Sequence, residues 1–244
     1  MDKRQPYDFD TRIHLLALGP GIKPGSTWAQ PATQVDMAPT FLGLAGLPKP
    51  ATMDGKSIVP LLMAAESSLQ QQQSVSTVYP LLASTRQHLA ELGESHVAKW
   101  RQAAFIEYYF NADNDKCMQN CTYPTLPWPS GGDYTCTDLD DNRVCWGGKT
   151  CTTNCYATEN IENNFIVLRS MSGSRFGNSL YAEFETGDQG LDWVNFTNIS
   201  FVEYFELDAD PWMMDNKARD RTAPIDALHA ELHAAYNCRG DACP

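Results

Sequence analysis

The chain has 244 residues, and its 30 acidic side chains outweigh 18 basic ones, which gives a formal net charge of −12. This balance argues against nucleic acid or an anionic membrane surface as the main partner. No apolar run approaches the roughly 18 residues of a membrane-spanning helix. The first six residues carry charges with no hydrophobic stretch behind them, so we expect no signal peptide there.

The first 65 residues are predicted to form the end of an α/β layer. Residues 10–18 end in an apolar run before a Gly-Pro-Gly turn, which indicates a mostly buried strand. Asp36 is a good N-cap for a helix that Gly46 can end, and residues 58–62 form a short apolar segment. Residues 66–102 include a Ser-rich and Gln-rich stretch, which indicates a linker or a surface insertion.

Residues 103–244 are predicted to form an antiparallel sheet with one helix packed on it. Runs of β-branched and aromatic residues indicate four strands, two of which make a hairpin. A loop over 117–155 separates the first two strands, and a loop of this length is expected to need cross-linking by disulfide bonds. The strands are expected at 103–109, 165–171, 180–185 and 201–207, and the helix near 224–236.

The eight cysteines and three N-glycosylation sequons share the second half of the chain, which favours the secretory pathway and disulfides. Cysteine spacings of Cys-x3-Cys also suit zinc, so metal binding is an alternative at those positions. Connectivity is not readable from sequence, although the last two cysteines suit a small terminal loop. The cysteines are Cys117, Cys121, Cys136, Cys145, Cys151, Cys155, Cys238 and Cys243, and the sequons begin at Asn120, Asn195 and Asn198.

His229 and His233 lie four residues apart on the predicted last helix, which is a spacing that metal sites use. Glu231 does not stand where the His-Glu-x-x-His motif requires its glutamate. Both histidines flank the apolar face of the helix instead of forming it. We therefore expect a solvated pair, and no metal ligand is assigned from the sequence.

Four blocks of sequence resemble the sulfatase family, in the order in which that family carries them. The first runs from Lys3 to Gly25, and the second contains Val-Asp-Met-Ala-Pro-Thr from residue 35. The third is Asp-Gly-Lys-Ser-Ile-Val-Pro-Leu from residue 54, and the fourth is Tyr-Phe-Glu-Leu-Asp-Ala-Asp-Pro from residue 204. The opening, the cysteine-rich insertion and the terminal cysteine pair resemble the N-acetylglucosamine-6-sulfatase branch, which acts on sulfated glycosaminoglycans.

The resemblance implies an alkaline-phosphatase-like α/β sandwich followed by a smaller antiparallel subdomain. Residues 1–65 would be the C-terminal end of the catalytic α/β domain, and 103–244 the subdomain with its disulfide-rich loop. Members of the family act in the lysosome or outside the cell. They hydrolyse sulfate esters with a formylglycine made in a Cys-x-Pro-x-Arg motif and with a calcium ion held by Asp and Asn oxygens.

Neither Cys-x-Pro-x-Arg nor the family's metal-binding Asp-His-Gly occurs in this sequence. We therefore expect a fragment that is inactive alone, whose partners are a sulfated sugar and the missing N-terminal part of the same enzyme. Lys3 matches the family lysine that contacts the sulfate, and its ammonium can donate to sulfate oxygens. Glu107, Tyr108 and Arg169 lie on strands that approach the substrate pocket in the family.

Two other interpretations stay open at this point. A secreted, disulfide-stapled module could bind sulfated glycans without turnover, and a catalytically dead sulfatase-like protein could be expressed in this form. The expected strand at 10–18 has no partner strands in the predicted element order, which favours the fragment.

Overall fold

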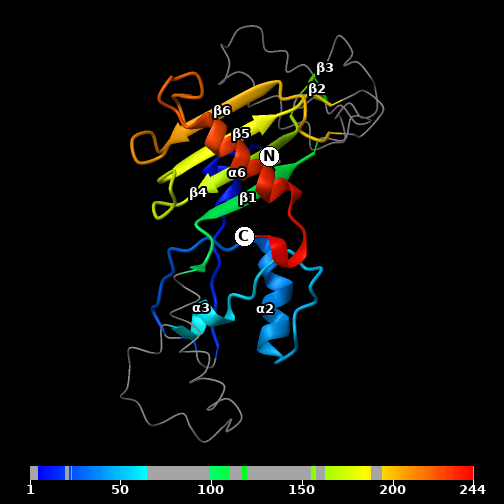
Figure 1. The fold of residues 1–244 in the computed structure, drawn as a ribbon, viewed down its shortest axis with the longest axis vertical. Coiled ribbons are helices and arrows are strands. Elements are labelled where there is room, and N and C mark those ends of the chain that lie inside the picture. Colours follow the sequence, from blue (N-terminus) through cyan, green and yellow to red (C-terminus); the bar gives the residue numbers. More distant parts are fainter. Residues whose placement is uncertain are drawn as a thin grey trace, which may run out of the picture. The chain divides into compact units, whose positions relative to one another are not determined.

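The computed structural model describes residues 5–19, 22, 24–64, 99–109, 117–119, 155–157, 163–187 and 194–243 (Figure 1). The chain divides into two compact units. The first comprises residues 1–105, 168–181 and 204–244, and the second comprises residues 106–167 and 182–203.

A four-stranded sheet with the order β1-β4-β5-β6 confirms the predicted antiparallel subdomain. Figure 1 shows these strands side by side, coloured from green to orange along the chain. β4 carries the apolar sequence Phe-Ile-Val-Leu and is buried along its whole length, as expected for a central strand with both faces covered. The strands are β1 (Ala103–Tyr108), β4 (Phe165–Ser170), β5 (Ser179–Phe184) and β6 (Phe201–Glu206).

Main-chain hydrogen bonds at the strand ends give the antiparallel register. In the first unit, the Met171 amide donates to the Gln102 carbonyl at 2.8 Å, and the Leu207 amide donates to the Asn178 carbonyl at 2.9 Å. In the second unit, the Glu185 amide donates to the Asn164 carbonyl at 3.1 Å. The predicted hairpin is therefore β4 and β5, joined over the Ser-Gly-Ser-Arg-Phe-Gly connection.

Helix α2 (Met37–Leu44) confirms the predicted helix, but Asp36 caps it differently from the expectation. A 3₁₀ turn, η1 (Gln34–Asp36), precedes the helix, and Thr33 is its N-cap. The Asp36 carboxylate accepts from the Thr33 amide at 2.8 Å, which makes Asp36 the third residue of a capping box. Gly46 ends the helix with φ +70°, and the Leu47 amide donates back to the Leu42 carbonyl at 2.9 Å.

A small apolar core lies beneath the short helix α3 (Val59–Ala64), which contains most of the predicted apolar segment. Ile58, Leu61, Leu62 and Trp100 are buried together there. The Trp100 indole donates to the Pro31 carbonyl at 2.8 Å, so the end of the predicted 66–102 insertion packs against the first 65 residues. The boundaries proposed at 65 and 102 stay a prediction, because 65–98 lie outside the described residues.

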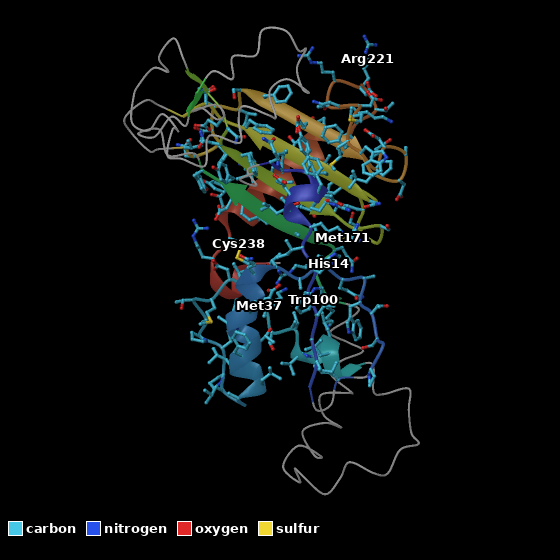
Figure 2. All side chains as sticks on the ribbon, turned by 180° about the vertical axis from the view of Figure 1, so that it is seen from behind. His14, Met37, Trp100, Met171, Arg221 and Cys238 are labelled. Carbon is cyan, nitrogen blue, oxygen red and sulfur yellow. A yellow bond between two sulfur atoms is a disulfide. The ribbon has the colours of Figure 1, made fainter. Side chains whose placement is uncertain are left out.

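Helix α6 (Ile225–Asn237) confirms the predicted last helix, with Leu228, Leu232 and Ala235 buried on one face. The turn between β4 and β5 contacts it through the ion pair of Arg175 with Glu231 at 2.7 Å. A terminal loop follows, closed by the disulfide between Cys238 and Cys243 that Figure 2 draws in yellow beside its Cys238 label.

The predicted strand at 10–18 is wrong. Residues Asp8–Thr11 form the short helix α1, and 12–18 belong to no regular element. Leu16 and Leu18 are 92% and 98% exposed, so this apolar run is not buried as expected. The physical reason is that a strand needs a partner for its backbone groups, and none of the described residues supplies one.

The predicted loop over 117–155 begins and ends in strands. β2 (Cys117–Gln119) and β3 (Cys155–Ala157) pair antiparallel, with Cys117 opposite Ala157. None of the helices formed by the described residues has the length and apolar character needed to cross a bilayer.

Candidate functional site

The residue with the clearest expected role, Lys3, lies outside the described residues, but the segment that follows it is well defined. We call residues 5–11 the anchor segment. Pro6 is among the residues with under 2% exposure. The Tyr7 ring meets the Phe205 ring of β6 edge-on at 6.1 Å between centroids. The anchor segment therefore packs on the sheet only a few residues after Lys3.

A buried ion pair fixes the anchor segment to β4. Arg169 donates from Nε to Asp8 Oδ1 at 2.7 Å and from Nη2 to Asp8 Oδ2 at 3.1 Å. Both side chains are mostly buried, at 10% and 19% exposure. The remaining guanidinium nitrogen, Nη1, donates to the carbonyls of Ser170 and Ser179. A two-bond geometry of this kind fixes direction as well as distance, so Arg169 determines where the anchor segment runs.

A second buried carboxylate, Asp36, organises the segment that precedes α2. Its side chain is fully buried and accepts from Arg101 Nη2 at 2.8 Å and from Nη1 at 3.1 Å. The Lys56 amide donates to it at 2.8 Å as well. Burial, followed by the neighbouring Arg101 charge, lowers the pKa of the Lys56 ammonium below its usual 10.5. Asp36 thus joins three segments that are up to 65 residues apart in sequence.

Glu107 and Tyr108 are neighbours on β1, and successive side chains on a strand point to opposite faces. Glu107 is exposed and accepts from the Tyr109 hydroxyl at 3.0 Å. Tyr108 stacks on the Phe165 ring with 5.3 Å between centroids. The two side chains therefore lie on different faces of the strand and in different surroundings.

The expected modification sites fall partly within the described residues. Asn195 and Asn198 are both exposed, as glycan acceptors must be. Asn195 Oδ1 accepts from the Thr197 hydroxyl at 2.6 Å, so the side chains of that sequon bond each other. The predicted Cys238–Cys243 disulfide is confirmed. Asn120, Cys121, Cys136, Cys145 and Cys151 lie outside the described residues, and for Cys117 and Cys155 only the backbone is described.

Calcium does not fit the described part of the chain. Calcium takes six to eight oxygen ligands, several of them carboxylates. The described residues hold no group of three carboxylates close enough to share an ion. The sequence also contains no Cys-x-Pro-x-Arg motif, so no bond-breaking step is assigned to the described residues.

Sequence reasoning missed the two buried ion pairs. No pattern around Asp8 indicates its partner, and Arg101 lies inside the stretch that is predicted to be a linker or a surface insertion. The partners are 161 residues apart for Arg169 with Asp8, which no local pattern can indicate. The basic residue Arg169 inside the otherwise apolar strand β4 is a sequence signal for a buried partner.

Comparisons with known proteins find similarity to sulfatases. Residues 1–91 match the family model described as N-sulphoglucosamine sulphohydrolase, C-terminal. The chain is 27% identical over its whole length to N-acetylglucosamine-6-sulfatase of Capra hircus and of Homo sapiens, of which it covers 32% and 33%. It is also 41% identical over 68 residues, 28% of this chain and 6% of the other, to the extracellular sulfatase SULF-1 homolog of Drosophila melanogaster. The chain thus spans about a third of the length of the first two relatives.

Proposed function

Since the chain belongs to the sulfatase family, we propose that it supplies the C-terminal part of a sulfuric ester hydrolase of the N-acetylglucosamine-6-sulfatase type. The proposed substrates are sulfated glycosaminoglycan sugars. In this proposal the formylglycine nucleophile and the calcium ligands belong to an N-terminal part that this sequence does not contain. The chain alone then has no sulfatase activity.

The observation that carries the proposal is the location of exposed apolar side chains. Of thirteen large hydrophobic side chains exposed among the described residues, nine lie within residues 9–47. Exposed apolar surface concentrated in one segment is typical of an interface. These nine side chains lie within residues 1–91, which match the C-terminal family model, and the described residues leave them uncovered. This supports the N-terminal part of a sulfatase as the proposed partner of residues 9–47.

Lys3 is proposed as the catalytic contact that this chain contributes, with its ammonium donating to the sulfate and to the leaving oxygen. The pairing of Asp8 with Arg169 supports this role, because it fixes the chain five residues later. We propose Arg169 as a residue that positions Lys3. Tyr108 stacks on Phe165, on the opposite face of β1 from Glu107, so the proposed pocket keeps only Glu107 of these two neighbours. Glu107, exposed and within reach of solvent, is the proposed pocket residue that can accept from sugar hydroxyls.

The secretory pathway, ending in the lysosome or outside the cell, is the proposed location. The Cys238–Cys243 disulfide supports it, because such bonds persist in oxidising compartments. The exposed sequons at Asn195 and Asn198 support a glycoprotein. The other six cysteines are proposed to be paired within or near the 117–155 insertion.

A chimera tests the contribution of Lys3. This chain would replace the matching C-terminal third of human N-acetylglucosamine-6-sulfatase, and hydrolysis of a 6-sulfated N-acetylglucosamine would be measured after confirming secretion. We expect activity that Lys3→Ala reduces by about two orders of magnitude, the scale of one lost charge-stabilising donor. Lys99→Ala, which removes an exposed lysine elsewhere, is the matched control. A secreted, active chimera that Lys3→Ala leaves unchanged would contradict the assignment.

A further inference from the structure

Two histidines of α6 face each other on the surface of the helix. Residues four apart lie one above the other on one side of a helix, and His229 and His233 have this spacing. Their ring centroids are 4.1 Å apart, with 40° between the ring planes. Their ligand nitrogens lie within 4.8 Å of each other. His229 is exposed and His233 is half-buried, so solvent reaches the pair.

This geometry suits chelation of one metal ion by two imidazoles. Imidazole nitrogens bind zinc and its neighbours at about 2.0–2.1 Å, so two nitrogens on one ion lie about 3–4 Å apart. Small side-chain rotations bring the two rings to that separation from their present distance. Water can complete the coordination of Cu²⁺ or Ni²⁺, which accept tetragonal sites with nitrogen and oxygen ligands.

The part of α6 that carries the two histidines is packed against the rest of the first unit. It therefore differs from the frayed end of a helix, where side chains are poorly ordered. Leu228 and Leu232 directly precede the two histidines, and both are 0% exposed. Glu231, between the histidines, bonds Arg175 Nε at 2.9 Å and thereby ties the helix to the turn after β4. Little conformational freedom is lost when an ion binds such a pre-ordered pair.

We propose that His229 and His233 form a binding site for a divalent transition metal on α6, with Cu²⁺ preferred over Ni²⁺ and Zn²⁺. The preference follows the general order of affinities for nitrogen sites. The site is distinct from the sulfatase role, since it uses nitrogen ligands where calcium requires oxygen. The sequence spacing alone favours a solvated pair. The structure adds the close approach of the two rings and the buried face of the helix beneath them.

Titration of the purified full-length chain with Cu²⁺ tests the proposal, followed by electron paramagnetic resonance to count nitrogen ligands. We expect one ion per chain with two equivalent nitrogens. His233→Gln and His229→Gln should each weaken binding about tenfold or more, since each removes half of the chelate. Circular dichroism would confirm that α6 is retained in both variants.

A triple variant supplies the control. His14→Gln, His88→Gln and His96→Gln together remove every other histidine of the chain. We expect this variant to bind Cu²⁺ with unchanged affinity and the same two-nitrogen signal. If the triple variant loses binding, or if His233→Gln retains it, the site on α6 does not exist.

Discussion

At the scale of single residues, two buried carboxylates hold distant parts of the first unit together. Asp36 is fully buried and its Arg101 partner is 8% exposed, so water contributes little to either charge. A buried ion pair is costly to break because the remaining charge has no solvent to stabilise it. We therefore expect the free energy of unfolding to depend more on the charge of Asp36 than on the size of its side chain.

Asp36→Asn keeps the size of the side chain and removes its charge. We expect a loss of about 3–5 kcal/mol in the free energy of unfolding, because Arg101 is left as an uncompensated buried cation. Urea denaturation of the variant measures this loss. Asp208→Asn is the control, since Asp208 bonds Asn178 at an exposed position and should change stability by under about 0.5 kcal/mol.

Arg169→Met tests the link between the anchor segment and β4. The change leaves the Asp8 carboxylate, which is only 19% exposed, without its cationic partner. We therefore expect a loss of about 2–3 kcal/mol in unfolding free energy. The double variant with Asp8→Asn should recover part of this loss, because no unpaired charge is then left behind. Equal losses in the single and double variants would show that the pairing contributes nothing.

At the scale of elements, the terminal loop docks on the segment before α3. The Gly240 amide donates to Asp54 Oδ1, and the Asp241 amide donates to the Ala51 carbonyl at 3.2 Å. Gly240 has φ +60°, and a Cβ there would lie 2.0 Å from the Ala51 oxygen. Only glycine permits this approach, so the loop depends on that residue.

Gly240→Ala should therefore lower the unfolding free energy by more than about 2 kcal/mol, from backbone strain and a direct clash. Gly177→Ala is a matched control, because Gly177 has φ +65° with nothing within 4 Å of a new Cβ. We expect that control to lose only about 1 kcal/mol, from strain alone. Thermal unfolding of both variants makes the comparison, and equal shifts would mean that the loop does not dock.

Strand β6 carries a group whose protonation affects stability. Burial, followed by the Glu206 carboxylate, raises the pKa of the Tyr204 phenol above its usual 10.0. The folded chain therefore keeps this proton to higher pH than the unfolded chain. The stabilisation is complete below pH 10.0 and is lost as pH rises through the raised value. Tyr204→Phe should lose less stability than the parent in this range, as measured by denaturation at stepwise alkaline pH.

Elements with a strong local pattern were predictable from sequence, and those that depend on distant partners were not. The helix at 37–44, the hairpin and the helix at 225–237 follow from periodicity and from Gly46. The run at 12–18 has the pattern of a buried strand, yet the described residues offer it no neighbour. A strand with this apolar pattern is stable only when neighbouring strands and a packed layer surround it, and the pattern alone does not supply them.

At the scale of the whole molecule, the candidate site also combines a feature that a local sequence pattern predicts with features that depend on distant residues. The role of Lys3 is predicted from its flanking motif, whereas the two buried ion pairs join residues more than sixty positions apart. The exposed apolar side chains of residues 9–47 are explained if a larger enzyme covers them. The chain then has the form of one part of a catalytic assembly.

Sulfate release from a 6-sulfated N-acetylglucosamine by the purified chain, with calcium present, tests this account most directly. Human N-acetylglucosamine-6-sulfatase serves as the positive control. We expect no turnover above background, because the sequence contains no Cys-x-Pro-x-Arg motif to provide the nucleophile. Turnover by the chain alone that Lys3→Ala abolishes would contradict the proposal that its catalytic partners lie in another part of the enzyme.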